Sequence, residues 1–557
     1  MFLERKELLE GPLSSEVIVV MKDAKILMLI LKAWFCRINV GKPILLMACL
    51  FLLSGNLSAQ GSDYWVFFKD KAGVDFDPAT WFSEKALERR QMQGIEITET
   101  DKPVVREYVK AVEDIADEML GCSRWFNAAY IKANHTQVET IRELPFVKAV
   151  EPAVVWEQSP YASSEMLDVD NEDLRRKQLD MFFPEILHEK GLNGNGVRIA
   201  VLDGGFPGVD THQAFSHLRD NNQIIKAHDF VKDKETVFHG NKHGTMVLSC
   251  IAGKTDNGRM GLAQAAEFLL ARTEKNFEPF KEEIYWMEAM EWADKEGADL
   301  INSSLGYTYH RYFKQAMDGK TSLVSKAANM AASKGILVVN AAGNSGTDSW
   351  HVIGTPADAD SILTVGGVDP DDHLHINFSS FGPTADGRLK PNVCASGEAL
   401  VAFKNGYLTA SGTSFASPLT CGFAACVKQA YPEYSIMELI DVIQQSASLY
   451  PYYDYAHGYG IPSAWKLFSN NNPIDPTFEL RETDSTYSVH IPGKIFNGTG
   501  MHNSTHLFYH LADKKGKLES YKVIKVYNNN PLEIKHHQLE GKLLRMHYLG
   551  YTLEKQF

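Results

Sequence analysis

Several features that would place this sequence of 557 residues in other classes of protein are missing from it. It has no basic stripe interleaved with aromatic residues, and its formal net charge is −14, so nucleic acid is not an expected partner. The seven cysteines include no C-x-x-C pair and no Cys/His ligand spacing, which argues against a cysteine-based zinc site. No internal repeat and no D-x-D-x-D-G calcium loop is present. With 44% hydrophobic and 23% charged residues, the chain is expected to be globular, and its length predicts several domains.

Residues 1–60 are predicted to form a leader that contains a signal peptide. The apolar run 43–53 follows basic residues and precedes small ones, and we expect cleavage near Ala59 or Gln60. Because the run is shorter than the ~20 residues that span a bilayer, we favour bacterial export over the alternative, a transmembrane anchor. Two of the cysteines would leave with the leader and five would remain, an odd number that argues against a dense disulfide framework.

The rest of the chain divides into four parts by its hydrophobic pattern. Residues 61–157 alternate short strand and helix patterns, which predicts a small α+β unit. Residues 158–180 are polar without a sustained apolar period, so we interpret them as an exposed linker and the place of a maturation cut. Between 181 and 468, continuous apolar strands alternate with helices, which predicts a doubly wound α/β domain with a mainly parallel sheet. Residues 473–557 alternate at period two and predict a β-rich C-terminal domain.

Four residues of the α/β part stand at predicted strand ends or helix starts, where such a sheet gathers its site residues. They are Asp203, His243, Asn344 and Ser414. Each alone has a simpler interpretation as a turn former or a helix cap. Together they match acyl transfer: imidazole takes the serine proton, a carboxylate orients the imidazole, and an amide with the serine N–H stabilises the oxyanion. The order Asp, His, Ser is that of subtilisin.

The stretches "VLDGG", "HGTMVLSCIAG", "SSLG", "NAAGN" and "SGTSFASP" together resemble the subtilisin-like serine peptidases, or subtilases, over residues 180–468. The resemblance implies a serine endopeptidase with Asp203, His243 and Ser414 as its triad and Asn344 as oxyanion donor. It also implies a set of substrate-binding residues. An edge segment that pairs with the substrate backbone is formed by Ser304, Leu305 and Gly306, and the primary pocket is surrounded by Ala341, Ala342, Gly343 and Gly354.

The same resemblance extends to the other parts of the chain. Residues 61–157 resemble a propeptide that inhibits the enzyme until it is cut, so the chain would be a self-processing zymogen acting on proteins or peptides. No cofactor is expected, although family members often bind structural calcium. The tail resembles sorting domains of the bacterial outer membrane, with an accessory binding module as the alternative, so the protein would be secreted or on the cell surface. Two departures from the family pattern are Gly204, where Thr or Ser is usual, and the bulky Tyr307 after "SSLG".

Two rival hypotheses remain. An α/β-hydrolase would need its acid and histidine after Ser414, where only Asp454 and His457 are candidates, and it leaves "HGT" and "NAAGN" unexplained. The other is a non-catalytic peptide-binding or adhesive surface protein on a peptidase scaffold. An active-site-directed serine probe distinguishes this binding protein from an enzyme.

Overall fold

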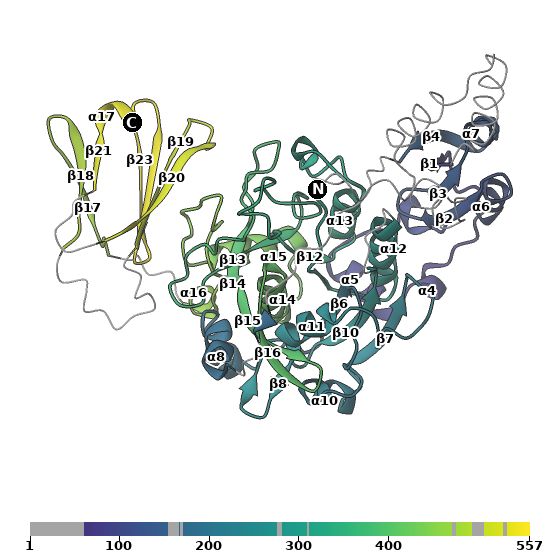
Figure 1. Ribbon diagram of the computed structural model, residues 1–557, viewed down its shortest axis with the longest axis horizontal. Coiled ribbons are helices and arrows are strands. Elements are labelled where there is room, and N and C mark those ends of the chain that lie inside the picture. The colour runs from purple at the N-terminus through teal and green to yellow at the C-terminus, as the bar shows by residue number, and fades with distance from the viewer. Residues whose placement is uncertain are drawn as a thin grey trace, which may run out of the picture. The chain divides into compact units, whose positions relative to one another are not determined.

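The computed structural model describes most of the chain beyond residue 60 (Figure 1). The described residues are 61–153, 166–167, 171–275, 281–308, 311–469, 475–492, 506–526 and 532–557. The predicted signal peptide and much of the predicted linker lie outside them. Within these ranges no helix is long and apolar enough to cross a bilayer. The five cysteines of the same ranges are all free thiols.

The N-terminal unit is a four-stranded antiparallel sheet with two helices against one face. The strands, in the order β2-β3-β1-β4, are β1 (Ser62–Phe68), β2 (Glu118–Ser123), β3 (Ala128–Ala133) and β4 (Val147–Pro152), and the helices are α6 (Arg106–Glu113) and α7 (His135–Arg142). Successive residues of β1 serve two cores: Val66 packs with Val112 and Val138 of the two helices, whereas Trp65 packs with α12 (Lys281–Lys295) of the next unit. The expected small α+β unit is therefore present, although the sequence did not predict β2 or α6.

A seven-stranded parallel sheet forms the centre of the chain, as the sequence predicted. Its order is β14-β13-β12-β11-β6-β10-β7. The strands are β6 (Arg198–Asp203), β7 (Ile224–Asp229), β10 (Glu267–Arg272), β11 (Leu300–Ser303), β12 (Leu337–Ala341), β13 (Leu363–Val368) and β14 (Val393–Ser396). From β6 the chain goes to the edge strand β7 and back to β10, and from β11 it runs outward on the other side. The sheet therefore has its switch point between β6 and β11, where α/β proteins bind ligands.

Helices cover both faces of this sheet, which makes it doubly wound (Figure 1). One face carries α11 (His243–Ala252) and α14 (Thr413–Ala430), and the other carries α12 and α13 (Leu323–Ser333). In β6, Ile199 and Val201 enter the first core, while Ala200 and Leu202 enter the second. Burial on both sides explains the continuous apolar strand sequences.

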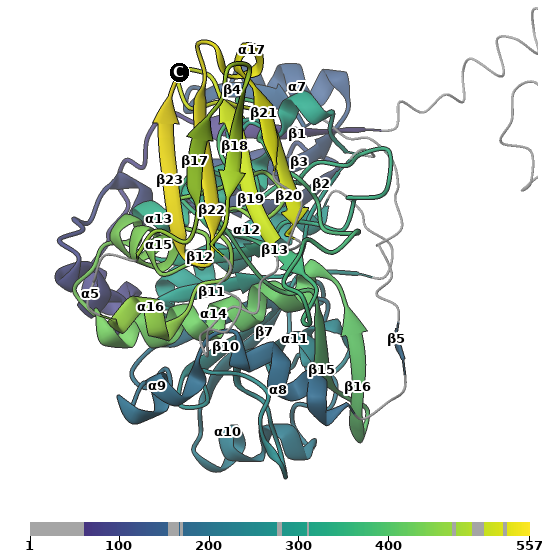
Figure 2. The same cartoon turned by 90° about the vertical axis from the view of Figure 1, so that its left-hand side faces the viewer.

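A β-hairpin leads into α14. It consists of β15 (Glu398–Phe403) and β16 (Gly406–Ser411), and β16 also pairs antiparallel with β5 (Met166–Leu167), as Figure 2 shows. Met166 and Leu167, which lie in the sequence between the N-terminal unit and the central sheet, therefore pair with the strand that precedes the helix of Ser414.

Helix α8 (Glu172–Asp180) corrects the prediction that all of 158–180 is an exposed linker. Leu174 and Leu179 are buried, and the Gln178 carboxamide accepts from the Leu400 N–H at 2.7 Å and donates to the Met260 carbonyl at 2.8 Å. The helix has too few apolar residues to show a period in the sequence, because much of its packing is through polar side chains.

The C-terminal unit consists of two antiparallel sheets that share one core. The first sheet contains β17 (Glu479–Glu482), β18 (Thr486–His490) and β21 (Glu533–Lys535), and the second contains β19 (His506–Ala512), β20 (Leu518–Lys525), β22 (Leu543–Tyr548) and β23 (Tyr551–Gln556). Val489 and Ile534 of the first sheet meet Leu511 and Leu544 of the second. The predicted β-rich C-terminal region is thus present (Figure 2).

Candidate active site

Asp203 and His243 form a buried pair at the carboxyl edge of the central sheet. Asp203 is the last residue of β6 and His243 is the first of α11. The two carboxylate oxygens lie 3.0 and 2.9 Å from His243 Nδ1. Asp203 is fully buried, His243 is 7% exposed, and the Gly204 N–H also donates to the carboxylate at 2.7 Å. The carboxylate therefore holds the proton of the ring on Nδ1 and leaves Nε2 as the basic nitrogen.

Close backbone contacts hold this pair together. A Cβ on Gly244 would lie 2.5 Å from the Gly205 carbonyl oxygen, so only glycine allows α11 to start this close to β6. A Cβ on Gly204 would lie 2.9 Å from the Cβ of Asn241, whose side chain accepts from the His243 N–H at 3.0 Å. The departure from the family pattern at Gly204 therefore has a steric reason, since Asn241 occupies the neighbouring space.

Ser414 lies in the first turn of α14, as the sequence predicted. Its hydroxyl donates to the Ser304 carbonyl at 3.3 Å, and the Ser304 hydroxyl donates to the Ser414 carbonyl at 2.8 Å. Its neighbour Phe415 packs against the His243 ring, with ring centroids 5.9 Å apart. The Ser414 side chain is 8% exposed, and its hydrogen bond to Ser304 places it at the end of β11.

Asn344 follows β12, and its amide orientation is determined by Thr413. Its Oδ1 accepts from the Thr413 N–H at 2.9 Å and from the Thr413 hydroxyl at 2.8 Å. Because a backbone N–H can only donate, the atom facing it must be the amide oxygen. Nδ2 then points to the other side and lies 3.2 Å from the position that a Cβ on Gly412 would take. The amide thus presents a donor next to the start of the serine helix.

The predicted substrate-pairing segment follows β11. Ser304 and Leu305 are each 3% exposed, whereas Gly306 is exposed. The next residue, Tyr307, is bridged to Thr355 by two backbone hydrogen bonds of 2.8 and 3.1 Å. The segment is therefore held at both ends around an exposed glycine.

The residues assigned to the primary pocket are small and uncharged. Ala341 is 5% exposed and Ala342 is fully buried. A Cβ on Gly343, whose φ is +106°, would lie 3.9 Å from the Gly354 nitrogen, so these two glycines are neighbours. Glycine at position 354 also allows a close approach of the backbone, because a Cβ there would be 3.0 Å from the Tyr307 carbonyl oxygen.

The pKa of His243 is raised above its ordinary value. Burial alone would lower the pKa, but the charge and the hydrogen bond of Asp203 outweigh it, and Glu274 adds to their effect. The imidazolium form is therefore stabilised by the carboxylate beneath it, as expected for a base that must hold a proton during a reaction.

A buried carboxyl cluster next to this pair was not anticipated from the sequence. The Tyr307 hydroxyl donates to Glu274 at 3.0 Å, and the Arg311 guanidinium lies 4.4 Å above the tyrosine ring. Burial and the neighbouring Glu274 raise the pKa of Glu282, which favours its protonated form. The bulky Tyr307 ring is thus held in the core, with 3% exposure.

Comparison with known proteins identifies the family. The model described as the subtilase family matches residues 194–460, and the model described as the Peptidase S8 propeptide domain of Bacteroidota matches residues 63–166. Subtilisin BL of Lederbergia lenta is 31% identical over 264 residues, which are 47% of this chain and 87% of that protein. The chain belongs to the subtilase family.

Other relatives of this subtilase are also proteases. Thermostable alkaline protease of Halalkalibacterium halodurans is 29% identical over 265 residues, which are 47% of this chain and 64% of that relative, just under two thirds. A solved structure of a mutant of the epidermin leader peptide processing serine protease from Staphylococcus aureus has a TM-score of 0.50 at 18% identity and covers 73% of this chain and 99% of that one. At this identity the likeness shows the fold alone.

The family assignment excludes the α/β-hydrolase hypothesis, and the structure shows what its two candidate residues do. Asp454 and His457 form a buried pair, with Nδ1 to carboxylate distances of 3.0 and 3.1 Å. His457 Nε2 accepts from the His375 N–H at 2.9 Å, and its ring contacts Phe508 of the C-terminal unit. This second pair therefore holds loops and β19 together.

Sequence reasoning missed the supporting residues Thr413 and Asn241. Thr413 had a visible signal, because a hydroxyl residue directly precedes the serine in "SGTSFASP". Asn241 had none, since its role depends on the local backbone path before α11. Among the described residues, no group of three or more His, Cys, Asp or Glu side chains is arranged to hold a metal ion.

Proposed function

We propose that this subtilase is a serine endopeptidase whose triad is Asp203, His243 and Ser414. The observation that carries the proposal is the buried Asp203–His243 pair beside a serine in the first turn of α14. The alternative, a non-catalytic peptide-binding protein, needs no oriented imidazole near a serine, so it does not account for the Asp203–His243 pair and Ser414 occurring together.

In the proposed reaction His243 is the general base. Its Nε2 takes the proton of Ser414 as Oγ attacks the peptide carbonyl carbon, and the Asp203 carboxylate stabilises the imidazolium that forms. The Ser414 hydroxyl must first turn away from the Ser304 carbonyl, a bond that is long at 3.3 Å. His243 then gives the proton to the leaving amine, and water releases the acyl group by the same steps.

Asn344 is the proposed oxyanion donor together with the Ser414 N–H. Thr413 holds the amide oxygen, so Nδ2 is oriented before substrate arrives. A fixed donor needs little reorganisation when charge develops on the carbonyl oxygen, and the N-terminus of α14 adds a favourable dipole. No cofactor takes part in these steps.

We propose protein or peptide substrates that bind as an added strand along Ser304, Leu305 and Gly306. The small walls formed by Ala341, Ala342, Gly343 and Gly354 contain no carboxylate for Arg or Lys, so a large uncharged residue is expected before the scissile bond. A substrate panel with strong preference for Arg or Lys would contradict this specificity.

We further propose that the propeptide domain inhibits the enzyme and is removed by a cut in the linker. Helix α8 is packed against the catalytic part, which narrows the expected cut to residues between Pro152 and Asn171. The leader 1–60 would direct export, and the C-terminal domain would act in surface sorting or as an accessory binding module. Structural calcium, common in the family, remains a prediction.

An active-site-directed fluorophosphonate probe tests the proposed activity. The wild-type chain should be labelled at Ser414, whereas Ser414→Ala should not be labelled and His243→Ala should be labelled far more slowly. A folded, processed wild-type protein that takes no label would support the peptide-binding alternative.

A further inference from the structure

The N-terminal unit carries an insertion that the β-α-β-β-α-β fold does not need. Between β1 and α6 the chain forms α4 (Pro78–Trp81), α5 (Glu84–Met92) and a 3₁₀ turn, η1 (Glu99–Asp101). In the basic fold a single helix crosses over after the first strand, and here α6 is that helix. The insertion therefore requires a separate explanation.

Helix α5 docks on the catalytic part at the amino edge of the central sheet. Arg89 donates to the carbonyls of Lys334, at 3.2 Å, and Ala298, and to Asp294 Oδ1 at 2.5 Å. Ala298 precedes β11 and Lys334 precedes β12. Asp203, Ser414 and Asn344 lie at the opposite, carboxyl edge, so this contact is separated from the candidate active site by the length of the strands.

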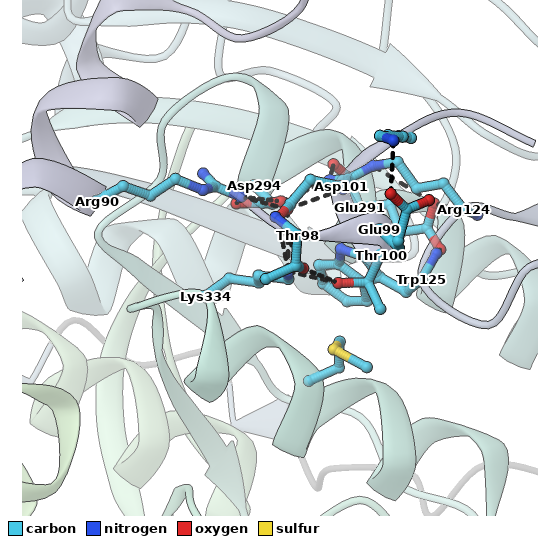
Figure 3. Close-up of polar contacts among 12 residues, drawn as sticks. Arg90, Thr98, Glu99, Thr100, Asp101, Arg124, Trp125, Glu291, Asp294 and Lys334 are labelled. Atoms are coloured by element: carbon cyan, nitrogen blue, oxygen red, sulfur yellow. Dashed lines mark hydrogen bonds and ion pairs between the residues drawn. The ribbon is translucent and has the colours of Figure 1, made fainter. Parts of the chain in front are cut away.

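Asp294 is the centre of the contact, as Figure 3 shows. The carboxylate, on the last turn of α12, accepts from Arg90 at 2.9 Å and from Arg124 at 2.5 Å in addition to Arg89. The side chains of Arg89 and Asp294 are fully buried, and those of Arg90 and Arg124 are 3% and 7% exposed. Three propeptide guanidinium groups thus meet at one catalytic carboxylate, and Arg90 also pairs with Asp101 at 3.0 Å.

The catalytic part also donates hydrogen bonds to the propeptide domain. Lys334 of the catalytic part donates to Asp101 of η1 at 3.0 Å and to the Thr100 hydroxyl at 2.6 Å (Figure 3). Further bonds surround this centre: Glu291 accepts from the Arg124 N–H at 3.0 Å, and Lys85 pairs with Asp299 at 3.2 Å. The two surfaces are complementary in charge, and burial protects their ion pairs from screening by salt.

We propose that this insertion, residues 78–101, together with Arg124, is an anchor that keeps the propeptide domain bound to the catalytic domain after the linker is cut. Retention then depends on the amino edge of the sheet and not on occupation of the cleft at Ser414. After the cut the propeptide domain stays as a bound subunit. The inference deepens the proposed zymogen function and rests on it only for its biological setting.

The test uses the full chain with Ser414→Ala, so that its outcome does not depend on the activity of the chain. A site for a sequence-specific viral protease is placed after Ala153 in one version and after Gln158 in another. After cutting, the dissociation constant of the two fragments is measured by gel filtration and by fluorescence of a labelled propeptide. We expect the fragments to co-elute and to bind with the same affinity in both versions, because the residues after β4 do not contribute to the anchor.

Anchor variants should then separate the fragments. Asp294→Asn removes a buried negative charge that Arg89, Arg90 and Arg124 share, which predicts an affinity about 100-fold to 1,000-fold weaker. Arg89→Met should weaken binding by about 10-fold to 100-fold, since it removes hydrogen bonds to three catalytic groups. The matched control is Lys110→Met, which breaks exposed ion pairs with Glu113 and Asp114 inside the propeptide and should change nothing.

Three results would overturn the anchor. They are fragments that separate on cutting, retention only when the residues up to Gln158 are kept, or anchor variants no weaker than Lys110→Met. If Asp294→Asn fails to fold, as judged by thermal melting, Arg89→Met alone decides the question. Failure of the serine probe to label the wild type would instead count against the proposed enzyme and leave the anchor intact.

Discussion

Two buried Asp–His pairs occur in this chain with almost the same geometry. In Asp203–His243 the Nδ1 to carboxylate distances are 3.0 and 2.9 Å, and in Asp454–His457 they are 3.0 and 3.1 Å. All four side chains are buried. The difference lies on the far side of each ring: His457 Nε2 accepts from the His375 N–H, whereas the His243 ring lies against Phe415, next to Ser414.

The comparison shows that a buried Asp–His pair can have a purely structural role. Asp454 also accepts from the N–H groups of Ala456 and His457, at 2.9 and 2.7 Å, and from the Tyr452 hydroxyl at 3.1 Å. It therefore organises a turn, and an imidazole whose Nε2 is occupied by a backbone N–H cannot take a proton from a substrate. What distinguishes the His243 ring is its contact with Phe415, the residue after Ser414 in the first turn of α14.

Removing each histidine gives the largest contrast. We expect His243→Ala to lower kcat by about 10⁴-fold to 10⁶-fold, a range taken from measurements on subtilisin itself. His457→Ala should leave kcat within about threefold, because its ring contacts loops and β19 instead of substrate. Steady-state kinetics on one peptide substrate checks both variants, and similar losses in the two would break the distinction between the pairs.

Asn344→Ala tests the proposed oxyanion donor, a group that has no counterpart in the proposed role of the Asp454–His457 pair. The substitution should lower kcat by about 100-fold to 1,000-fold with little change in KM, because the hydrogen bond from the Asn344 side chain strengthens only as the oxyanion forms. This magnitude is the one known for the corresponding residue of subtilisin. Single-turnover kinetics measures the split. A defect mainly in KM would mean that Asn344 shapes its loop and does not stabilise the transition state.

The loss of activity at acid pH should be caused by protonation of His243 alone. Because the pKa of His243 is raised, its neutral form should be lost at a pH above the ordinary histidine pKa of about 6.5. As pH falls below that pKa, kcat/KM should drop by about tenfold per unit, because only neutral imidazole accepts the serine proton. His457→Gln should leave this loss of activity in place, and a flat profile down to pH 5 would rule out His243 as the base.

Asp454→Asn should have the smallest effect on activity and a clear one on stability. The substitution weakens a buried acceptor of several hydrogen bonds, so we expect a loss of about 1 to 3 kcal/mol in the free energy of unfolding. Thermal melting in the Ser414→Ala background avoids self-digestion. The matched exposed control is Asp173→Asn in α8, whose ion pairs are solvent-exposed and should contribute little. Equal shifts in the two variants would contradict a structural role for the second pair.

The sequence by itself determined the parallel sheet and the positions of Asp203, His243, Asn344 and Ser414 at its edge. This was possible because strands buried on both faces leave continuous apolar runs, and polar residues at the ends of such runs must gather at one edge. The motif spacing was equally local, since "SGTSFASP" contains both the serine and the start of its helix.

Only the tertiary structure decided that Asp454 and His457 form a second buried pair, how Thr413 orients the Asn344 amide, and where α5 docks. These facts depend on contacts between residues far apart in the chain, such as Asp294 with Arg89, and such contacts leave no periodic trace in the sequence. Helix α8 was not predicted for the same reason, because its position depends on the hydrogen bonds of Gln178 to Leu400 and Met260 and not on an apolar stripe. Hydrogen bonds between residues far apart in the chain are therefore known only from the tertiary structure. Such a bond depends on the distance and direction of its two partners in space and not on their order in the chain.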